Sequence, residues 1–430
     1  MSAPGEELLA RSQEILDGGQ LRPGVNPPPG QLAELAEGVA IISGFAHTVV
    51  FATAEGLVLF DLPIPAQAPG TIKALREWSD LPVHTVVVTH GHGDHVGGIP
   101  QLLDDAERRG HQRPRIVGHE LVPERLRRYA VTAGYVAAIN RRQFGETGVL
   151  PLAGFDRSAP AAPRFVEPDV VYRDQLTLAV GGIHFELNHA RGETDDHTWA
   201  FVPEHGVLCP GDLVLWSFPN AGNPQKVQRY AADWAEALRL MIARRPQLMI
   251  GQHGLPVAGE ARIAGMLDTI ARALEHLVAS TLELMNRGAG LDEIIHTVRV
   301  PEEVASAPYL NPGYDDPEFV VRNIWRLYGG WWDLDPASLK PAPLDDLAAE
   351  VASLAGGPER LVERAIELSR NGNHRLASHL IEWAARAAPA AAHEARTAIY
   401  EERARVEPSL MAKGIFLAAA RASAQGELLR

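Results

Sequence analysis

Three histidines and one aspartate occupy residues 90–95, HGHGDH, in a chain of 430 residues. The preceding residues 85–88, TVVV, are apolar and β-branched, which predicts a buried strand that ends in a glycine-rich loop. Imidazole and carboxylate groups are common ligands of zinc and related metals. Glycine between the histidines lets the backbone fold several ligands around one ion. We therefore expect a metal-binding loop at the end of a strand.

This loop resembles the ligand motif of the metallo-β-lactamase superfamily. The resemblance implies that His90 and His92 bind one metal ion, while Asp94 and His95 bind a second. It also implies an α/β fold, in the form of an αββα sandwich. The strands and the helix that the sequence predicts between residues 39 and 88 agree with that fold.

Two further residues stand where the superfamily places other ligands. Asp212 ends residues 207–212, VLCPGD, at the usual position of the acid that bridges the two metals. His253 comes after the apolar residues 248–250 and directly before a glycine. The resemblance implies that Asp212 holds the hydroxide that attacks the substrate. Asp94 is the second carboxylate that we expect to act in catalysis.

The third ligand of the first metal distinguishes this chain from ordinary superfamily members, which carry a Pro-Gly-His motif at this point. Glu193 occupies the histidine position, and this substitution resembles the alkylsulfatase branch. Its distance of nineteen residues from Asp212 matches that branch, although the branch uses a glutamate as the bridge. His189 and His197 lie four residues to either side and remain alternative ligands. For both histidines a structural role is the favoured interpretation.

An anionic ester also needs groups that hold its negative charge. The alkylsulfatase resemblance implies an asparagine and an arginine after the bridging acid. Asn220 stands at the asparagine position, but the arginine position falls near Gln225. Lys226, or Arg191 from an earlier loop, could supply the cation instead. The alternative interpretation is that both cations are ordinary surface residues.

A second resemblance to alkylsulfatases lies after the metal-binding region. Residues 311–314, NPGY, precede residues 323–336, NIWRLYGGWWDLDP, and their order is similar to a pattern of that family.

From about residue 341 the chain is rich in alanine, leucine, glutamate and arginine. This composition, with glycine and proline as breaks, predicts helices over 343–355, 358–371, 374–387, 390–405 and 408–424. The resemblance implies that this region forms a homodimer. The chain stops before the sterol-carrier-like domain typical of the branch, so we expect a compact ester.

We predict an N-terminal arm over residues 1–30, a catalytic domain over 31–300 and a helical dimerisation domain over 301–425. Residues 118–165 of the catalytic domain are interpreted as an insertion. Its predicted helical start is basic, with arginines at Arg125, Arg127, Arg128, Arg141 and Arg142. Residues 145–163 are predicted to be a loop. The insertion could cover the site, contact a partner subunit or present a solvated helix face.

The formal net charge of −14 disfavours a nucleic-acid partner, because phosphate binding needs a basic surface. Cys209 is the single cysteine and lies in an apolar run, so we expect neither a disulfide nor a cysteine-based metal site. The first thirty residues lack the apolar segment of a secretory signal, and no run is long enough to span a bilayer. We therefore expect a cytoplasmic enzyme without a membrane partner.

These features favour a hydrolase with two zinc ions that cleaves a small anionic ester, above all a sulfate ester. Three carboxylates against two divalent ions leave the site formally positive, so it still attracts an anion. Iron or manganese are alternative metals. Two other activities remain open. The first is hydrolysis of a carboxylic ester, lactone or thioester on the same fold. The second is a diiron oxidoreductase, since carboxylate-rich ligand sets suit iron.

Overall fold

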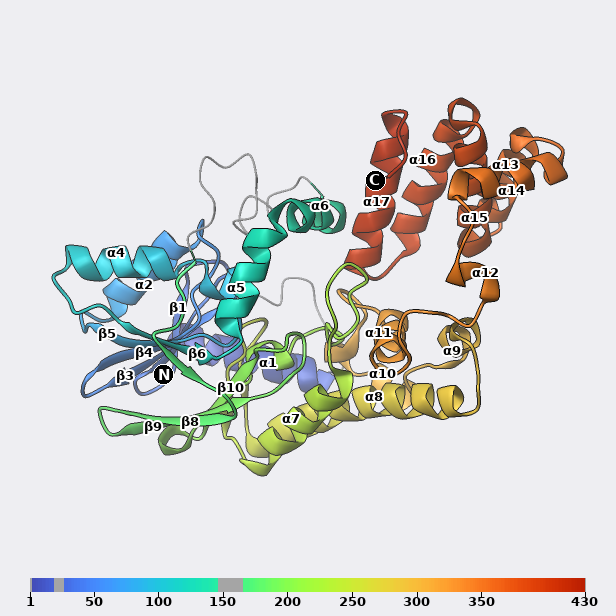
Figure 1. The fold of residues 1–430 in the computed structure, drawn as a ribbon. Helices are drawn as coiled ribbons and strands as arrows, with labels where there is room; N and C mark the ends of the chain where they lie inside the picture. The colour runs from blue at the N-terminus through green and yellow to red at the C-terminus, as the bar shows by residue number, and fades with distance from the viewer. Residues whose placement is uncertain (1, 19–26, 146–164, 430) are drawn as a thin grey trace.

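The computed structural model of the protein describes residues 2–18, 27–145 and 165–429. Two β-sheets pack face to face, helices cover their outer faces, and a helical region follows (Figure 1). This arrangement confirms the predicted αββα sandwich with a helical C-terminal region. Among the described residues, no helix is both long and apolar enough to cross a membrane.

The first sheet contains the strand that leads into the metal-binding loop. Its strands run in sequence order from β1 to β7, with bounds Leu32–Ala36, Val39–Ile42, Thr48–Thr53, Gly56–Phe60, Val83–Val87, Arg115–His119 and Val170–Tyr172. Neighbours are antiparallel from β1 to β4 and parallel from β4 to β7. Strand β5, which leads into the metal-binding loop, therefore lies inside the sheet and pairs in parallel with β4 on one side and β6 on the other.

The second sheet carries the candidate ligands that come later in the chain. Its order is β13-β12-β11-β10-β9-β8, and in chain order β8 to β13 have the bounds Gln175–Val180, Ile183–His189, Thr198–Val202, Val207–Cys209, Leu248–Met249 and Val257–Ala258. Strands β11 and β12 are parallel, so both end at the same edge of this sheet. Asp212 follows β11 and His253 follows β12, which brings them to one edge.

Aromatic side chains from both sheets form the core between them. Phe51 and Phe60 of the first sheet are fully buried, as is Phe185 of the second. The rings of Phe51 and Phe185 lie 5.3 Å apart in an edge-to-face arrangement. Cys209 is also fully buried here, as expected for a core residue. This apolar interior holds the two sheets, and hence the loops at their edges, in a fixed relation.

Helices of the sandwich flank these sheets on both sides (Figure 1). Their bounds are Ala3–Gly18 (α1), Ala68–Trp78 (α2), Gly93–Val96 (α3), Ile99–Arg108 (α4), Val122–Val131 (α5), Ala133–Phe144 (α6), Ala231–Ala243 (α7) and Glu260–Asn286 (α8), with short 3-10 turns at Pro203–His205 (η1) and Gly211–Leu213 (η2). Helices α5 and α6 belong to the predicted insertion. The predicted loop after them falls almost entirely on residues outside the described part of the chain.

The C-terminal region is helical, as predicted. Its elements are Leu291–Thr297 (α9), Glu302–Ala305 (α10), Pro308–Leu310 (η3), Pro317–Gly329 (α11), Pro336–Leu339 (α12), Leu344–Ala355 (α13), Pro358–Arg370 (α14), His374–Ala387 (α15), Pro389–Val406 (α16) and Leu410–Ala424 (α17). Helix α17 packs closely on α6, because Gly414 has no side chain to meet the backbone of Gln143. The helical region therefore contacts the insertion near the candidate site.

Candidate metal centre

The metal-binding loop begins where strand β5 ends and runs into the short helix α3. His92 lies just before α3 in an extended backbone conformation, and Asp94 and His95 lie in its first turn. His90 and His95 are fully buried. The local pattern of strand, glycine and short helix thus directs four candidate ligands to the same edge of the sandwich.

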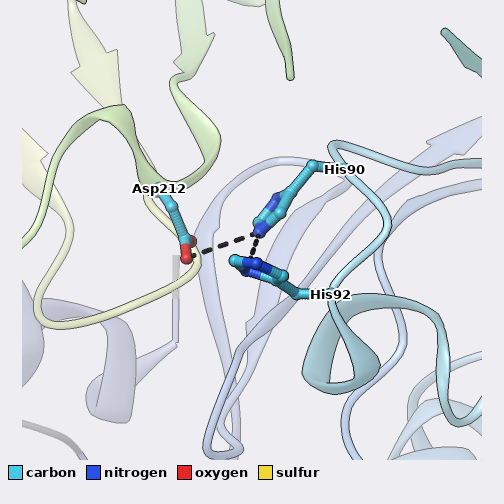
Figure 2. Close-up of side chains that lie close together, drawn as sticks. All are labelled: His90, His92 and Asp212. Atoms are coloured by element: carbon cyan, nitrogen blue, oxygen red, sulfur yellow. Dashed lines mark hydrogen bonds and ion pairs between the residues drawn. The ribbon is translucent and has the colours of Figure 1, made fainter. Parts of the chain in front are cut away.

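His90, His92 and Asp212 form one group of candidate ligands. Their ligand atoms all lie within 4.8 Å of one another. His90 Nε2 is 2.8 Å from His92 Nδ1 and 3.8 Å from Asp212 Oδ2. Figure 2 shows both imidazole rings directed toward each other and toward the carboxylate.

Asp94, His95 and His253 form a second group, and Asp212 lies beside it as well. Asp94 Oδ2 is 3.6 Å from the Nε2 atoms of both His95 and His253. Asp212 Oδ2 is 3.4 Å from His95 Nε2 and 3.5 Å from His253 Nε2. One carboxylate oxygen therefore lies between the two groups, where a bridging ligand would have to be.

The electrostatics of this centre favour positive charge. Burial opposes ionisation of Asp212, but His95 and His253 hold the pKa of its carboxyl well below the usual value. Burial likewise opposes protonation of His95, but Asp212, Asp94 and Asp61 raise the pKa of its imidazole well above the usual value. Asp212 Oδ1 and His95 Nε2 are buried without a hydrogen-bond partner among the described residues. Such unsatisfied nitrogen and oxygen ligands suit a metal cation.

Two buried residues, Asp61 and His197, orient candidate ligands through hydrogen bonds. Asp61 accepts hydrogen bonds from the Thr89 backbone N–H and hydroxyl, both at 2.7 Å, and from His95 Nδ1 at 2.8 Å. The last contact leaves His95 Nε2 directed into the centre. His197 Nε2 accepts from the Asp212 backbone N–H at 3.0 Å, which fixes the turn that carries the central carboxylate.

Glu193 also faces the centre, from the loop between β9 and β10. Its Oε1 lies 3.7 Å from His92 Nδ1, and its side chain is buried. Burial raises the pKa of Glu193 and Asp212 adds to the effect, whereas Arg229 opposes it. Arg229 Nη1 is 2.8 Å from the Glu193 carboxylate, which also accepts a hydrogen bond from Asn220 Nδ2. The arginine and the amide thus hold Glu193 at Oε1, the same oxygen that lies 3.7 Å from His92 Nδ1.

The two alternative histidines occupy different environments. His189 stacks on His119 with ring centroids 3.8 Å apart, and its Nε2 contacts the Asp195 carbonyl at 2.9 Å. His197 is occupied by the Asp212 backbone, as described above. Both histidines thus have structural partners where the structure places them. His197 also stacks on His90 with ring centroids 4.9 Å apart, whereas Glu193 directs a carboxylate oxygen toward His92.

The predicted insertion contributes a buried arginine rather than a wholly solvated face. Arg125 is 3% exposed and its Nε donates to Asp196 Oδ1 at 2.8 Å. Asp196 Oδ2 in turn accepts from the backbone N–H of Gly91 at 2.9 Å, within the metal-binding loop. The interpretation as a solvated helix face is therefore wrong for Arg125, although it fits Arg127, whose side chain is 64% exposed. The sequence did not reveal this role, because the partner of Arg125 lies 71 residues away.

A cavity of about 540 Å³ opens over the centre. Its polar wall includes Asn220, Lys226 and Arg229, and burial with repulsion from Arg229 lowers the pKa of Lys226 to about 8. Its apolar wall comes from both sheets' loops, α6 and the start of α17: Phe45, Ile64, Val136, Phe144, Leu215, Trp216 and Leu410. Helix α6 of the insertion therefore contributes to the wall of the cavity.

Arg191 was expected as a substrate-binding cation, but the structure places it outside the cavity lining. Its side chain is 49% exposed, pairs with Asp233 at 2.6 Å and stacks on Tyr230. Arg229 is the buried arginine that lines the cavity instead, and the sequence did not identify it as a candidate. Its only local signal was its place just before helix α7.

Comparisons with known proteins agree with this architecture. Residues 43–253 match the metallo-beta-lactamase superfamily, and residues 290–426 match the alkyl sulfatase dimerisation family. A linear primary-alkylsulfatase from Pseudomonas sp. is 25% identical over 348 residues, which are 77% of this chain and 65% of that protein. An alkyl/aryl-sulfatase from Saccharomyces cerevisiae is 24% identical over 71% of this chain and 49% of its own length. The chain thus spans about half to two thirds of these relatives.

A solved structure shares the fold over most of the chain. The stereoselective inverting sec-alkylsulfatase Pisa1 from Pseudomonas sp. superposes with a TM-score of 0.80 and 23% sequence identity. The match covers 92% of this chain and 66% of that one. The sandwich and the helical region therefore occur together in a known arrangement.

Proposed function

We propose that this chain, which combines a metallo-β-lactamase domain with an alkylsulfatase dimerisation domain, is a metal-dependent hydrolase of sulfate esters. The observation that carries the proposal is the cavity around Asp212. Two groups of candidate metal ligands meet at its carboxylate, and a buried arginine, a buried asparagine and a partly buried lysine line the same cavity. The cavity thus offers both a centre for hydrolysis and groups for an anion.

Seven residues would hold two zinc ions. His90, His92 and Glu193 would bind one, Asp94, His95 and His253 the other, and Asp212 would lie between them. Nitrogen and oxygen ligands at this spacing fit zinc, and the buried unpaired atoms of His95 and Asp212 need a cation beside them. A pair of bound zinc ions would supply Lewis acidity and make hydroxide available near neutral pH. Asp61 would keep His95 in the tautomer that presents its Nε2.

The anionic group of the ester would bind on the side of the anion loop, which we define as residues 217–226. Asn220 and Lys226 of this loop line the cavity, and Arg229 follows closely in sequence. Lys226 Nζ donates to Asn140 Oδ1 at 2.7 Å, so its ammonium group is held in place at the cavity wall. Charged donors at the wall would bind the sulfate oxygens and stabilise negative charge on the departing group.

The organic part of the ester would lie against the apolar wall. Trp216, Phe144 and Leu410 come from three separate parts of the chain and line the same cavity. An apolar wall opposite charged groups suits an ester with a polar head and an apolar substituent.

A carboxylic ester or lactone is the second candidate substrate. Gln225, at the position where the alkylsulfatase resemblance implies an arginine, donates its amide to the backbone of Ile139 at 3.2 Å. It therefore adds no positive charge to the cavity, which favours a less anionic substrate.

We also infer a homodimer formed through the helical region. The match to the dimerisation family covers residues that expose several large apolar side chains, namely Leu327, Tyr328, Trp331, Leu334, Leu339, Leu344, Leu347 and Leu354. A surface formed from these side chains would suit contact with another chain.

The test is a substrate panel on zinc-loaded protein, with alkyl and aryl sulfates beside carboxylic esters and lactones of matched organic groups. Ion chromatography would measure released sulfate. We expect turnover of sulfate esters, and we expect Lys226→Ala to raise KM for them. Turnover of carboxylic esters or lactones alone would reject the sulfatase proposal in favour of the second candidate.

A further inference from the structure

The anion loop has no regular secondary structure, yet its position decides where Asn220 and Lys226 lie. It runs between η2 and α7, and most of its residues are buried. Buried backbone groups need hydrogen-bond partners, and an irregular loop cannot supply them all from within. Several backbone groups of residues 221–223 find partners in Asp315, just before helix α11, and in Asn323 within it, which lie 93 and 102 residues later in the chain.

Asp315 is the main partner. Its side chain is fully buried, and its Oδ2 accepts from the backbone N–H of Gly222 at 2.6 Å and of Asn223 at 3.2 Å. Its Oδ1 accepts from the backbone N–H of Asp316 at 2.8 Å. Both carboxylate oxygens are therefore used, and two of the three donors belong to the anion loop.

Helix α11 completes the attachment. Asn323 Nδ2 donates to the carbonyls of Ala221 at 2.9 Å and Gly222 at 3.0 Å. A Cβ atom at Gly222 would come within 2.5 Å of the backbone at Phe319 and Val320, so the loop lies directly on the helix. The loop backbone is thus fixed between Asn220 and Lys226, both of which line the cavity.

We propose that Asp315 is a positioning residue, which holds the anion loop so that Asn220 and Lys226 face the bound anion. The inference depends on the proposed function for its kinetic part. Asp315 does not line the cavity, and its hydrogen bonds go to backbone N–H groups rather than to the proposed metal ligands. It acts through the backbone at Gly222 and Asn223. Because Asp315 belongs to the helical C-terminal region, the site on the sandwich needs this region for its shape.

The neighbouring residue provides a matched control. Asp316 begins helix α11, where its side chain accepts from the Glu318 backbone N–H at 2.8 Å. Asparagine caps helices as well as aspartate does, so Asp316→Asn should preserve this contact. In Asp315→Asn an NH2 group that cannot accept replaces one carboxylate oxygen, and the negative charge that strengthens the bonds from Gly222 and Asn223 is lost. The two variants make the same chemical change one residue apart, and only one affects the loop.

The experiment measures kcat and KM for 4-nitrophenyl sulfate, the affinity for inorganic sulfate and backbone hydrogen exchange, all on zinc-loaded full-length protein. Loss of a hydrogen bond to a charged group predicts a rise of roughly tenfold in KM and in the sulfate Kd of Asp315→Asn, with kcat changed less. Exchange within residues 220–226 should accelerate. Asp316→Asn should stay within about twofold of wild type by each measure.

Unchanged exchange in residues 220–226 of folded Asp315→Asn would overturn the proposal, as would an unchanged sulfate affinity. Equal effects of Asp315→Asn and Asp316→Asn would also overturn it, because they would indicate general destabilisation of α11. A wild-type protein that neither binds sulfate nor releases it would refute the proposed function instead. Hydrogen exchange would then still decide whether Asp315 holds the loop.

Discussion

Replacement of Asp61 by asparagine should weaken metal binding although Asp61 is not itself a proposed ligand. Asp61 is fully buried and has a φ of 60°, a left-handed conformation that asparagine tolerates better than most residues. Asparagine can keep one oxygen for the Thr89 backbone N–H. Its amide would then face His95 Nδ1, which now contacts the carboxylate at 2.8 Å.

The expected size of the effect follows from the tautomer of His95. Opposite an amide N–H, His95 Nδ1 must be unprotonated to accept a hydrogen bond. The ring proton would then reside on Nε2, the atom that faces Asp94 and Asp212. Loss of such orienting contacts typically costs roughly 10- to 100-fold in metal affinity, or about 1.4 to 2.7 kcal/mol.

Competition with a chromogenic chelator would measure the zinc affinities of wild type and Asp61→Asn. We expect one of the two zinc ions to bind roughly 10- to 100-fold more weakly. Asp105→Asn is the matched control, since Asp105 is buried but pairs with Arg76 at 2.9 Å. Asp61→Asn that folds normally and retains both zinc affinities would refute the reasoning.

Further predictions concern individual side chains of the site. Glu193→Gln should reduce zinc from two ions per chain toward one by elemental analysis; retention of two would remove Glu193 from the ligand set. The pKa of Lys226 is lowered to about 8 by burial and Arg229, so its positive charge is lost as pH rises through that value. Sulfate affinity should therefore fall above about pH 8 in wild type and lose this dependence in Lys226→Met, as titration calorimetry would test. Arg125→Ala leaves the buried Asp196 without its arginine and should reduce the free energy of unfolding by about 3 kcal/mol in urea, against less than about 1 kcal/mol for the exposed Arg127→Ala. Arg191→Ala should leave KM for sulfate esters within about twofold; a large rise would return this residue to the site.

The elements that local sequence patterns determine were predictable. The helices from α13 to α17 begin and end within two residues of their predicted bounds, because glycine and proline separate amphipathic stretches there. The histidine-rich loop was predictable for the same reason. Its ligands are close in sequence, and a short helix brings Asp94 and His95 together.

Residues that act through distant partners were not predictable from one sequence. Asp61 orients a histidine 34 residues away, and Asp315 binds a loop 93 residues away. Arg229 resembled any polar residue before a helix until the fold placed it beside Glu193. Each of these contacts depends on how the two sheets and α11 pack. The spacing of residues along the sequence does not specify that packing.

Titration of metal-free protein with zinc, with release of sulfate from an alkyl sulfate as the readout, tests the central claim most directly. The proposed arrangement around Asp212 predicts that sulfate release is absent without metal and reaches its maximum at two zinc ions per chain. A maximum at one zinc ion, or sulfate release without metal, would contradict the two-metal centre. Two zinc ions bound without sulfate release from any ester would contradict the sulfatase proposal.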